Sequence, residues 1–229
     1  VYKRQSMLRR NTLKLMAFTL SAALMGVSLP ASALTEGEDY VKLETPFPNS
    51  EGTLIKIFSY DSPFCYKYDD RVDSKLLPRV EKELGLKFKP VYLETRAKYG
   101  VVVTEFFIVC LLKDKSAGRD IESPDSLFSK ATKTLYGDYH RMGERWDGGE
   151  AQFLETLTKA TGVTLDEFNK ERTSPEVQAL RKEWSNSYAI AKIQGIPAYV
   201  VNGKYLIMIK SIRSLDAMFE TIKELKALP

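Results

Sequence analysis

The sequence contains little cysteine and almost no histidine: two cysteines, Cys65 and Cys110, and one histidine, His140, in 229 residues. A single histidine excludes a histidine-rich metal site, so we expect no bound metal and place His140 at the surface. The only glycine-lysine pair near a strand, Gly203-Lys204, lacks the glycine spacing of a phosphate-binding loop. Internal repeats and low-complexity segments are absent as well. We therefore expect the chain to work without a cofactor.

Long apolar runs are also scarce, and the longest lies near the N-terminus. Residues 7–14 are basic, residues 15–29 are almost wholly apolar, and the stretch ending at Ala33 closes on an A-x-A pattern. This pattern is typical of a secretory signal peptide cleaved after Ala33, and the apolar run is shorter than the roughly 20 residues of a membrane span. An uncleaved membrane anchor is the alternative. Residues 1–6 lie upstream of this segment, and we predict export to the periplasm.

Basic residues are not in excess once the first 33 residues are set aside. These carry five basic and no acidic residues, so the formal net charge falls from +4 for the whole chain to −1 for residues 34–229. Nothing then favours a nucleic-acid partner. The compartment beyond the inner membrane is oxidising, so a C-x-x-C-like site in an exported protein would act on disulfides.

Apolar patterning predicts an α/β fold at both ends of the mature chain. Residues 34–48 read as an extended segment, which precedes a strand over 54–60 and a helix from Ser62 to about Asp73. A second helix over 75–85 ends at a glycine, and a strand over 86–93 follows, parallel to the first. After a long interval, strands over 198–201 and 204–209 flank Asn202-Gly203, a hairpin signal, and a helix over 215–228 closes the chain.

Only helical periodicity is found between these two regions. The expected helices cover residues 101–113, 124–139, 151–161, 164–172 and 175–191. We therefore predict one α/β domain formed by residues 34–97 and 185–229, with an all-helical domain of residues 98–184 inserted into it.

Ser62-Pro63-Phe64-Cys65 lies where the first strand runs into its helix. A helix N-terminus stabilises negative charge, so a cysteine there is expected to favour its thiolate. Two cysteines at this spacing would form a redox pair, but the first position is serine. The plainer interpretation is a helix cap followed by a buried cysteine. A second candidate segment, Gly195-Ile196-Pro197-Ala198, precedes the hairpin.

The segments 58–68 and 191–207 resemble the DsbA family of periplasmic thiol-disulfide oxidoreductases, and residues 93–100 and 144–146 match it too. The resemblance covers nearly all of the mature chain and implies a thioredoxin fold with an inserted all-helical domain. It also implies a cis Ile196-Pro197 bond beside the redox motif, and a substrate-binding role for Pro63, Phe64, Ile196 and Pro197.

The same resemblance implies a function and partners. Family members donate disulfides to exported cysteine-containing client proteins and are reoxidised by an inner-membrane partner of the DsbB/DsbI type. The branch with the motif Cys-Pro-Phe-Cys is the most similar, and it is associated with a periplasmic arylsulfate sulfotransferase as client. We expect a monomer.

Ser62 departs from the family at the nucleophilic cysteine, while Cys65 occupies the resolving position. Oxygen cannot form the mixed disulfide through which exchange proceeds, so we expect this chain to be redox-inactive. An engineered replacement and a native serine with a changed role both remain open. Two rival functions follow: a glutathione-dependent transferase or isomerase that uses Ser62, and a non-catalytic module that binds clients.

Three further groups have structural alternatives. Lys56, on the strand that leads to Ser62, would tune the redox site by favouring a nearby thiolate, or it would extend from a sheet face toward water. Cys110 lies in an apolar helix and is expected to be a buried structural thiol, although counting alone allows a disulfide to Cys65. The aromatic residues Tyr136, Tyr139 and Trp146 are expected to pack in the core.

Overall fold

A computed structural model describes residues 34–229, which form one compact unit. The signal-peptide prediction falls on residues outside this part. Among the described residues, no helix is both long enough and apolar enough to span a membrane. The strands are β1 (Tyr40–Lys42), β2 (Thr53–Phe58), β3 (Lys87–Tyr92), β4 (Ala198–Val201) and β5 (Tyr205–Ile207).

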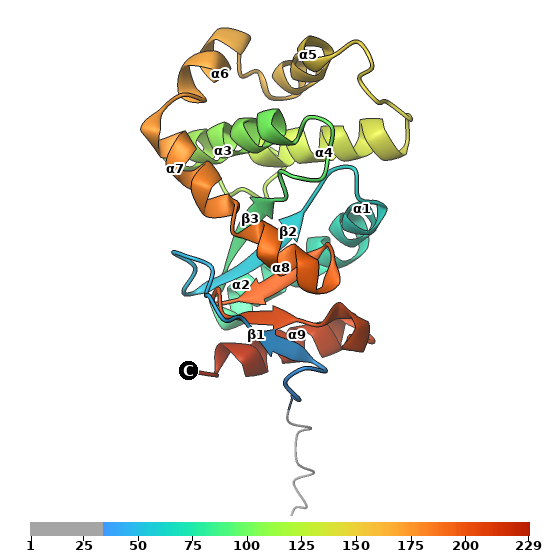
Figure 1. Cartoon of the computed structure of the whole chain (residues 1–229), viewed down its shortest axis with the longest axis vertical. Coiled ribbons are helices and arrows are strands. Elements are labelled where there is room, and N and C mark those ends of the chain that lie inside the picture. The colour runs from blue at the N-terminus through green and yellow to red at the C-terminus, as the bar shows by residue number, and fades with distance from the viewer. Residues whose placement is uncertain (1–33) are drawn as a thin grey trace, which may run out of the picture. The chain divides into compact units, whose positions relative to one another are not determined.

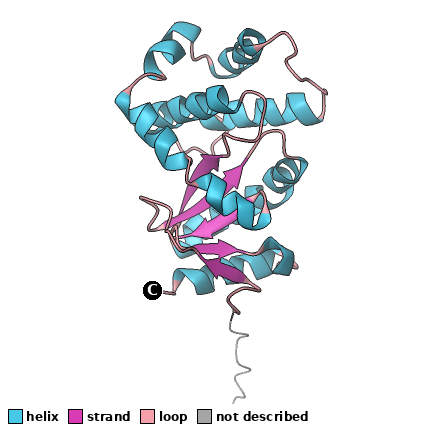
Figure 2. Ribbon diagram, viewed as in Figure 1, coloured by secondary structure: helices cyan, strands magenta, loops and turns pink. Residues whose placement is uncertain are grey.

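The strands form one mixed sheet in the order β1-β5-β4-β2-β3 (Figure 2). β2 and β3 are parallel, as predicted, and the other neighbours are antiparallel. Asn202 and Gly203 both have positive φ, at 53° and 67°, which is the geometry of a tight hairpin turn between β4 and β5. The hairpin prediction is confirmed.

Helices flank the sheet and fill the long interval in the sequence (Figure 1). They are α1 (Pro63–Tyr68), α2 (Ser74–Leu84), α3 (Gly100–Ser116), α4 (Leu127–His140), α5 (Glu150–Thr161), α6 (Leu165–Glu171), α7 (Pro175–Trp184), α8 (Ser187–Gln194) and α9 (Leu215–Lys226), with a π-helical segment η1 (Asp69–Asp73) and a 3-10 turn η2 (Ile209–Ser211). All the strands lie in residues 34–97 and 185–229, and α3 to α7 lie in residues 98–184. The fold is therefore a thioredoxin fold with helical insertion; the boundaries at 97 and 184 remain a prediction.

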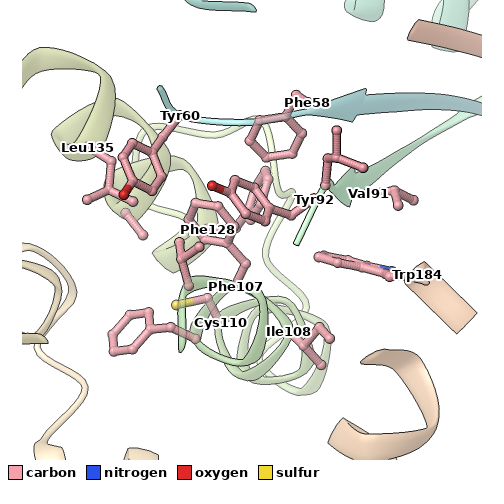
Figure 3. Packing of buried hydrophobic residues seen from close by; sticks show 14 of the residues in the cluster. Phe58, Tyr60, Val91, Tyr92, Phe107, Ile108, Cys110, Phe128, Leu135 and Trp184 are labelled. Carbon is pink, nitrogen blue, oxygen red and sulfur yellow. The ribbon is translucent and has the colours of Figure 1, made fainter. Parts of the chain in front are cut away.

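Alternation along β2 separates two cores. Ile55 and Ile57 pack in a large cluster with residues of α3 and α4, whereas Leu54 packs with residues of α2 and α9 on the other face. Lys56 shares the face of Leu54 by this alternation. The large cluster is rich in aromatic rings, among them Phe107 and Phe128 (Figure 3). β2 is thus buried on both faces, and its one cation is placed inside the protein.

The structure differs in detail from three expectations about the elements. The helix predicted over residues 62–73 is α1 followed by a π-helical segment, and the helix predicted over 175–191 is divided into α7 and α8 by a break at residues 185–186. The segment over 34–48 contains a strand, β1, which pairs with β5 at the far end of the sequence. A strand of three residues owes its structure to that distant partner and has little pattern of its own.

Candidate functional site

The site is the turn between β2 and α1. Ser62 caps α1 in extended conformation: its Oγ accepts the backbone N–H of Cys65 at 3.2 Å. Pro63 occupies the first helical position, where its missing N–H leaves no hydrogen bond unmade. Position 62 and position 65 are therefore held together across the first turn of α1, as the sequence predicted.

The four residues of this turn differ in solvent exposure. Ser62 and Cys65 are buried, with relative exposures of 2% and 0%, whereas Phe64 is 62% exposed and Pro63 is exposed as well. Pro63 and Phe64 are therefore the residues of this turn that form its surface. The sulfur lies directly beneath it.

Burial raises the pKa of the Cys65 thiol, whereas Lys56 and hydrogen bonds from the Ser62 side chain and the Ser59 backbone lower it. The net direction is upward, because desolvation disfavours the thiolate more than these groups favour it. Burial therefore outweighs the groups that favour a thiolate at Cys65.

Lys56 lies at the centre of a buried charge cluster. Its ammonium pairs with the Asp73 carboxylate and lies 3.8 Å from a carboxylate oxygen of Asp69, and the Tyr199 hydroxyl donates to Asp73. Burial opposes the charge of Lys56, but the two carboxylates outweigh it and raise the lysine pKa. Lys56 is 3% exposed, so the alternative of a lysine that reaches water is wrong.

The Ile196–Pro197 peptide bond is cis. Ala198, the next residue, is paired with Ile57, so Pro197 lies at the edge of the sheet where β2 ends and the turn to Ser62 begins. Ala198 and Cys65 belong to the same core cluster, and Ile196 packs against it. Pro197 is buried and Ile196 is half-buried. The fold thus brings the two candidate segments to the same edge of the sheet, although they are far apart in sequence.

Sequence reasoning missed the carboxylates of the charge cluster and misplaced the histidine. Asp69 and Asp73 stand four residues apart on η1, a spacing that puts both on one face and could have indicated a partner for Lys56. His140 is half-buried rather than at the surface: its Nε2 lies 2.7 Å from the Tyr60 carbonyl oxygen, and its ring stacks on Tyr66 at 4.8 Å between centroids.

The remaining expectations concern packing. Cys110 is buried and, like Cys65, is a free thiol, so the disulfide between the two is not formed. Tyr136 and Trp146 are each 1% exposed, and Tyr139 is partly buried against the same core, as predicted. Within residues 34–229, no group of three or more His, Cys, Asp or Glu residues is arranged to hold a metal ion.

Comparisons with known proteins identify the family. No protein-family model matches the sequence. The thiol:disulfide interchange protein DsbL of Escherichia coli O6:H1 is 47% identical over 208 residues, which cover 90% of this chain and 93% of the relative. The crystal structure of DsbL from Salmonella enterica serovar Typhimurium superposes with a TM-score of 0.81 at 45% identity, over 87% of this chain and 100% of that one.

A more distant structure supports the fold alone. DsbA from Klebsiella pneumoniae has a TM-score of 0.66 at 20% identity, over 86% of this chain and 99% of that one. The DsbL matches carry the assignment to a family, since they exceed 40% identity over almost the full length of both chains. The chain belongs to the DsbA family of thiol-disulfide oxidoreductases and resembles its DsbL members.

Proposed function

We propose that this chain carries the scaffold of a periplasmic dithiol oxidase that donates disulfides to exported proteins, and that Ser62 leaves it without that exchange reaction. The observation that supports this most directly is the contact across the first turn of α1, where the Ser62 Oγ accepts the Cys65 N–H at 3.2 Å. A sulfur at position 62 would lie at the spacing of a redox pair.

The reaction of the parent site needs sulfur at both positions. A client thiolate would attack the sulfur at position 62 of a 62–65 disulfide, the S–S bond would break, and Cys65 would leave as a thiolate. A second client thiol would then displace position 62, so the client loses two electrons and two protons and the pair at 62 and 65 becomes a dithiol. An inner-membrane partner of the DsbB/DsbI type would reoxidise that dithiol. A serine hydroxyl cannot take part in either displacement.

Lys56 has a defined role in this proposal. It lowers the pKa of the Cys65 thiol, which is the leaving group of the first displacement. A better leaving group makes the disulfide a stronger oxidant. Lys56 is fixed by Asp73 and Asp69, so its position does not depend on the client. It is a positioning and tuning residue, and it does not contact the client.

Clients would meet the exposed Pro63 and Phe64 and the Ile196-Pro197 segment at the same edge of the sheet. Export would follow from the signal peptide expected in residues 1–33. An arylsulfate sulfotransferase is the client that the resemblance to DsbL implies.

The test replaces the side-chain oxygen of residue 62 with sulfur. Ser62→Cys, oxidised and shown to be folded, should oxidise a reduced two-cysteine peptide, whereas the unchanged chain should not exceed the buffer control. Ser62→Cys combined with Cys65→Ser is the matched control, because it has one thiol at the site and should also be inactive. A folded and oxidised Ser62→Cys protein that fails to oxidise the peptide would show the proposal to be wrong. Glutathione conjugation by the unchanged chain would instead support the transferase that uses Ser62.

A further inference from the structure

A groove beside the Ile196-Pro197 segment has no role in the reaction described above. It lies between α8 and the loop that follows β3, and its volume is about 240 Å³. We call it the α8 groove. It is lined by Leu93, Thr95, Arg96, Tyr188, Ala191, Lys192, Gly195 and Ile196.

Two lining residues of the α8 groove connect it to the candidate redox site. The Arg96 Nε donates to the Asp61 carboxylate at 2.9 Å, and Asp61 immediately precedes Ser62. Ile196, which also lines the groove, directly precedes Pro197. A peptide that crosses the surface above Ser62 and Cys65 would therefore reach the groove within a few residues.

The lining of the groove has charge of one sign. Arg96 and Lys192 line it, and no carboxylate does. Asp61 compensates the charge of Arg96. Lys192 is exposed and lies 4.4 Å from the centroid of the Tyr188 ring, and no carboxylate of residues 34–229 lies within ion-pair distance of it. The groove thus offers an apolar floor and one uncompensated cation, which suits an apolar side chain next to an acidic one.

The backbone at the groove is available for pairing. Ile196 lies between α8 and β4, and within the described part of the chain its N–H and C=O make no hydrogen bond. An extended peptide can use such a segment as an added strand, and antiparallel pairs are the commoner kind. If a client cysteine lies opposite Pro197, an antiparallel client runs from its cysteine toward Gly195. The residues that follow the cysteine then enter the α8 groove.

We propose that the α8 groove is a specificity site for the client segment that directly follows the reactive cysteine, and that it selects an apolar residue accompanied by an acidic one. In this proposal Lys192 pairs with the acidic side chain of the client, and Tyr188 and Ile196 contact its apolar side chain. This inference rests on the proposed function, because it assigns a place to the client of that reaction.

The test uses three fluorescent heptapeptides with a central cysteine. In the first, Phe-Glu-Glu follows the cysteine; in the second, Phe-Lys-Lys follows it; in the third, Glu-Glu-Phe precedes it. Binding to the unchanged chain is measured by fluorescence anisotropy, and oxidation is measured with two-cysteine versions and the Ser62→Cys chain. The variant is Lys192→Glu. Lys170→Glu, on α6, makes the same charge change at an exposed lysine that does not line the groove.

We expect the first peptide to bind more tightly than the second and third. Lys192→Glu should weaken the first peptide about fivefold and strengthen the second, since exchanging one exposed attraction for a repulsion has about that effect. Lys170→Glu should change neither. Equal affinities for the three peptides, or an acidic preference ahead of the cysteine, would overturn the proposal.

The oxidation assay separates this proposal from the one on which it rests. If Ser62→Cys oxidises all three peptides at equal rates, the oxidase function stands and the α8 groove has no selective role. If it oxidises none of them, the oxidase function itself is wrong. A preference for the first peptide that Lys192→Glu removes supports both.

Discussion

Cys65 and Cys110 have the same exposure and different surroundings. Both are free thiols, and both are fully buried. At Cys65 the charge of Lys56, the Ser62 side chain and the Ser59 backbone lower the thiol pKa, against the effect of burial. Cys110 lies on α3 in the aromatic core, where Phe107 and Phe128 are neighbours in the same packed cluster (Figure 3).

The difference shows which physical property separates the thiol at the candidate site from the thiol in the aromatic core. Burial raises the pKa of both thiols, so burial does not separate them. At Cys65, Lys56, the Ser62 side chain and the Ser59 backbone lower the pKa against burial, and Asp73 adds to the effect of burial. At Cys110 the next cause, Asp114, raises the pKa further, and Lys113 alone lowers it. The electrostatic neighbourhood therefore separates the two sites, and Cys65 directly follows the exposed Phe64.

The largest expected effect comes from breaking the charge cluster beside Cys65. Lys56→Met leaves Asp73 buried without its cation, so the free energy of unfolding should fall by about 3–5 kcal/mol. Combining Lys56→Met with Asp73→Asn removes both charges and keeps an acceptor for the Tyr199 hydroxyl. The double variant should lose less than the sum of the two single variants, by about 1–3 kcal/mol. Urea denaturation measures all three variants.

A loss below about 1 kcal/mol for Lys56→Met would mean that the pair is solvated like a surface pair. The contrast with the apolar site of Cys110 would then disappear.

How far the sequence predicts this site depends on the range of the interactions. The start of α1 at Ser62-Pro63 and the end of α2 at Gly85 follow from residues within one turn, and both were predicted. The partners of Lys56 were not predicted, because Asp73 lies 17 positions away in the sequence, at the end of a π-helical segment. Local patterns give the elements and the position of the turn, whereas the charge beneath the turn depends on the tertiary fold.

His140 and β1 also depend on tertiary contacts that local sequence patterns do not predict. A lone histidine at the end of a helix has no pattern that predicts its stacking on Tyr66, which lies on a different helix. β1 becomes a strand because β5 pairs with it, over 160 residues later in the chain. The resemblance to a family supplied the proximity of Pro197 to the turn, which no local pattern contains.

A second, smaller effect should distinguish the two thiols directly. Cys110→Ser places a hydroxyl in an apolar core, where the carbonyl one turn earlier in α3 can accept from it, so the variant should lose about 2 kcal/mol. Cys65→Ser makes the same exchange at a position whose polar neighbours, the Ser62 side chain and the Ser59 backbone, lower the thiol pKa. It should lose about 1 kcal/mol less than Cys110→Ser. Thermal unfolding of both variants at one pH is the measurement, and equal losses would show that burial alone governs the two sites.

The smallest effect concerns a carboxyl group on the charged side of the comparison. Glu122 lines a cavity of about 220 Å³ together with Lys56 and Asp73. Burial, followed by repulsion from Asp120, Glu81 and Asp73, raises the pKa of Glu122 to about 7. The folded protein therefore holds this proton more tightly than the unfolded chain, whose carboxyl has a pKa near 4.5. The contribution to stability is complete below pH 4.5 and is lost as the pH rises to 7.

Glu122→Gln cannot ionise and should not lose stability in that range. The difference in unfolding free energy between Glu122→Gln and the parent should therefore rise in favour of the variant between pH 4 and pH 8. The rise should be about 1 kcal/mol, because solvent screens a carboxyl that is only partly buried. Glu51→Gln removes the same charge at an exposed turn before β2, outside the cavity, and serves as the control. A pH-independent difference for Glu122→Gln would show that the Glu122 carboxyl is hydrated in the folded protein. The charges of Lys56 and Asp73 would then have no effect on the protonation of a residue in the loop before α4.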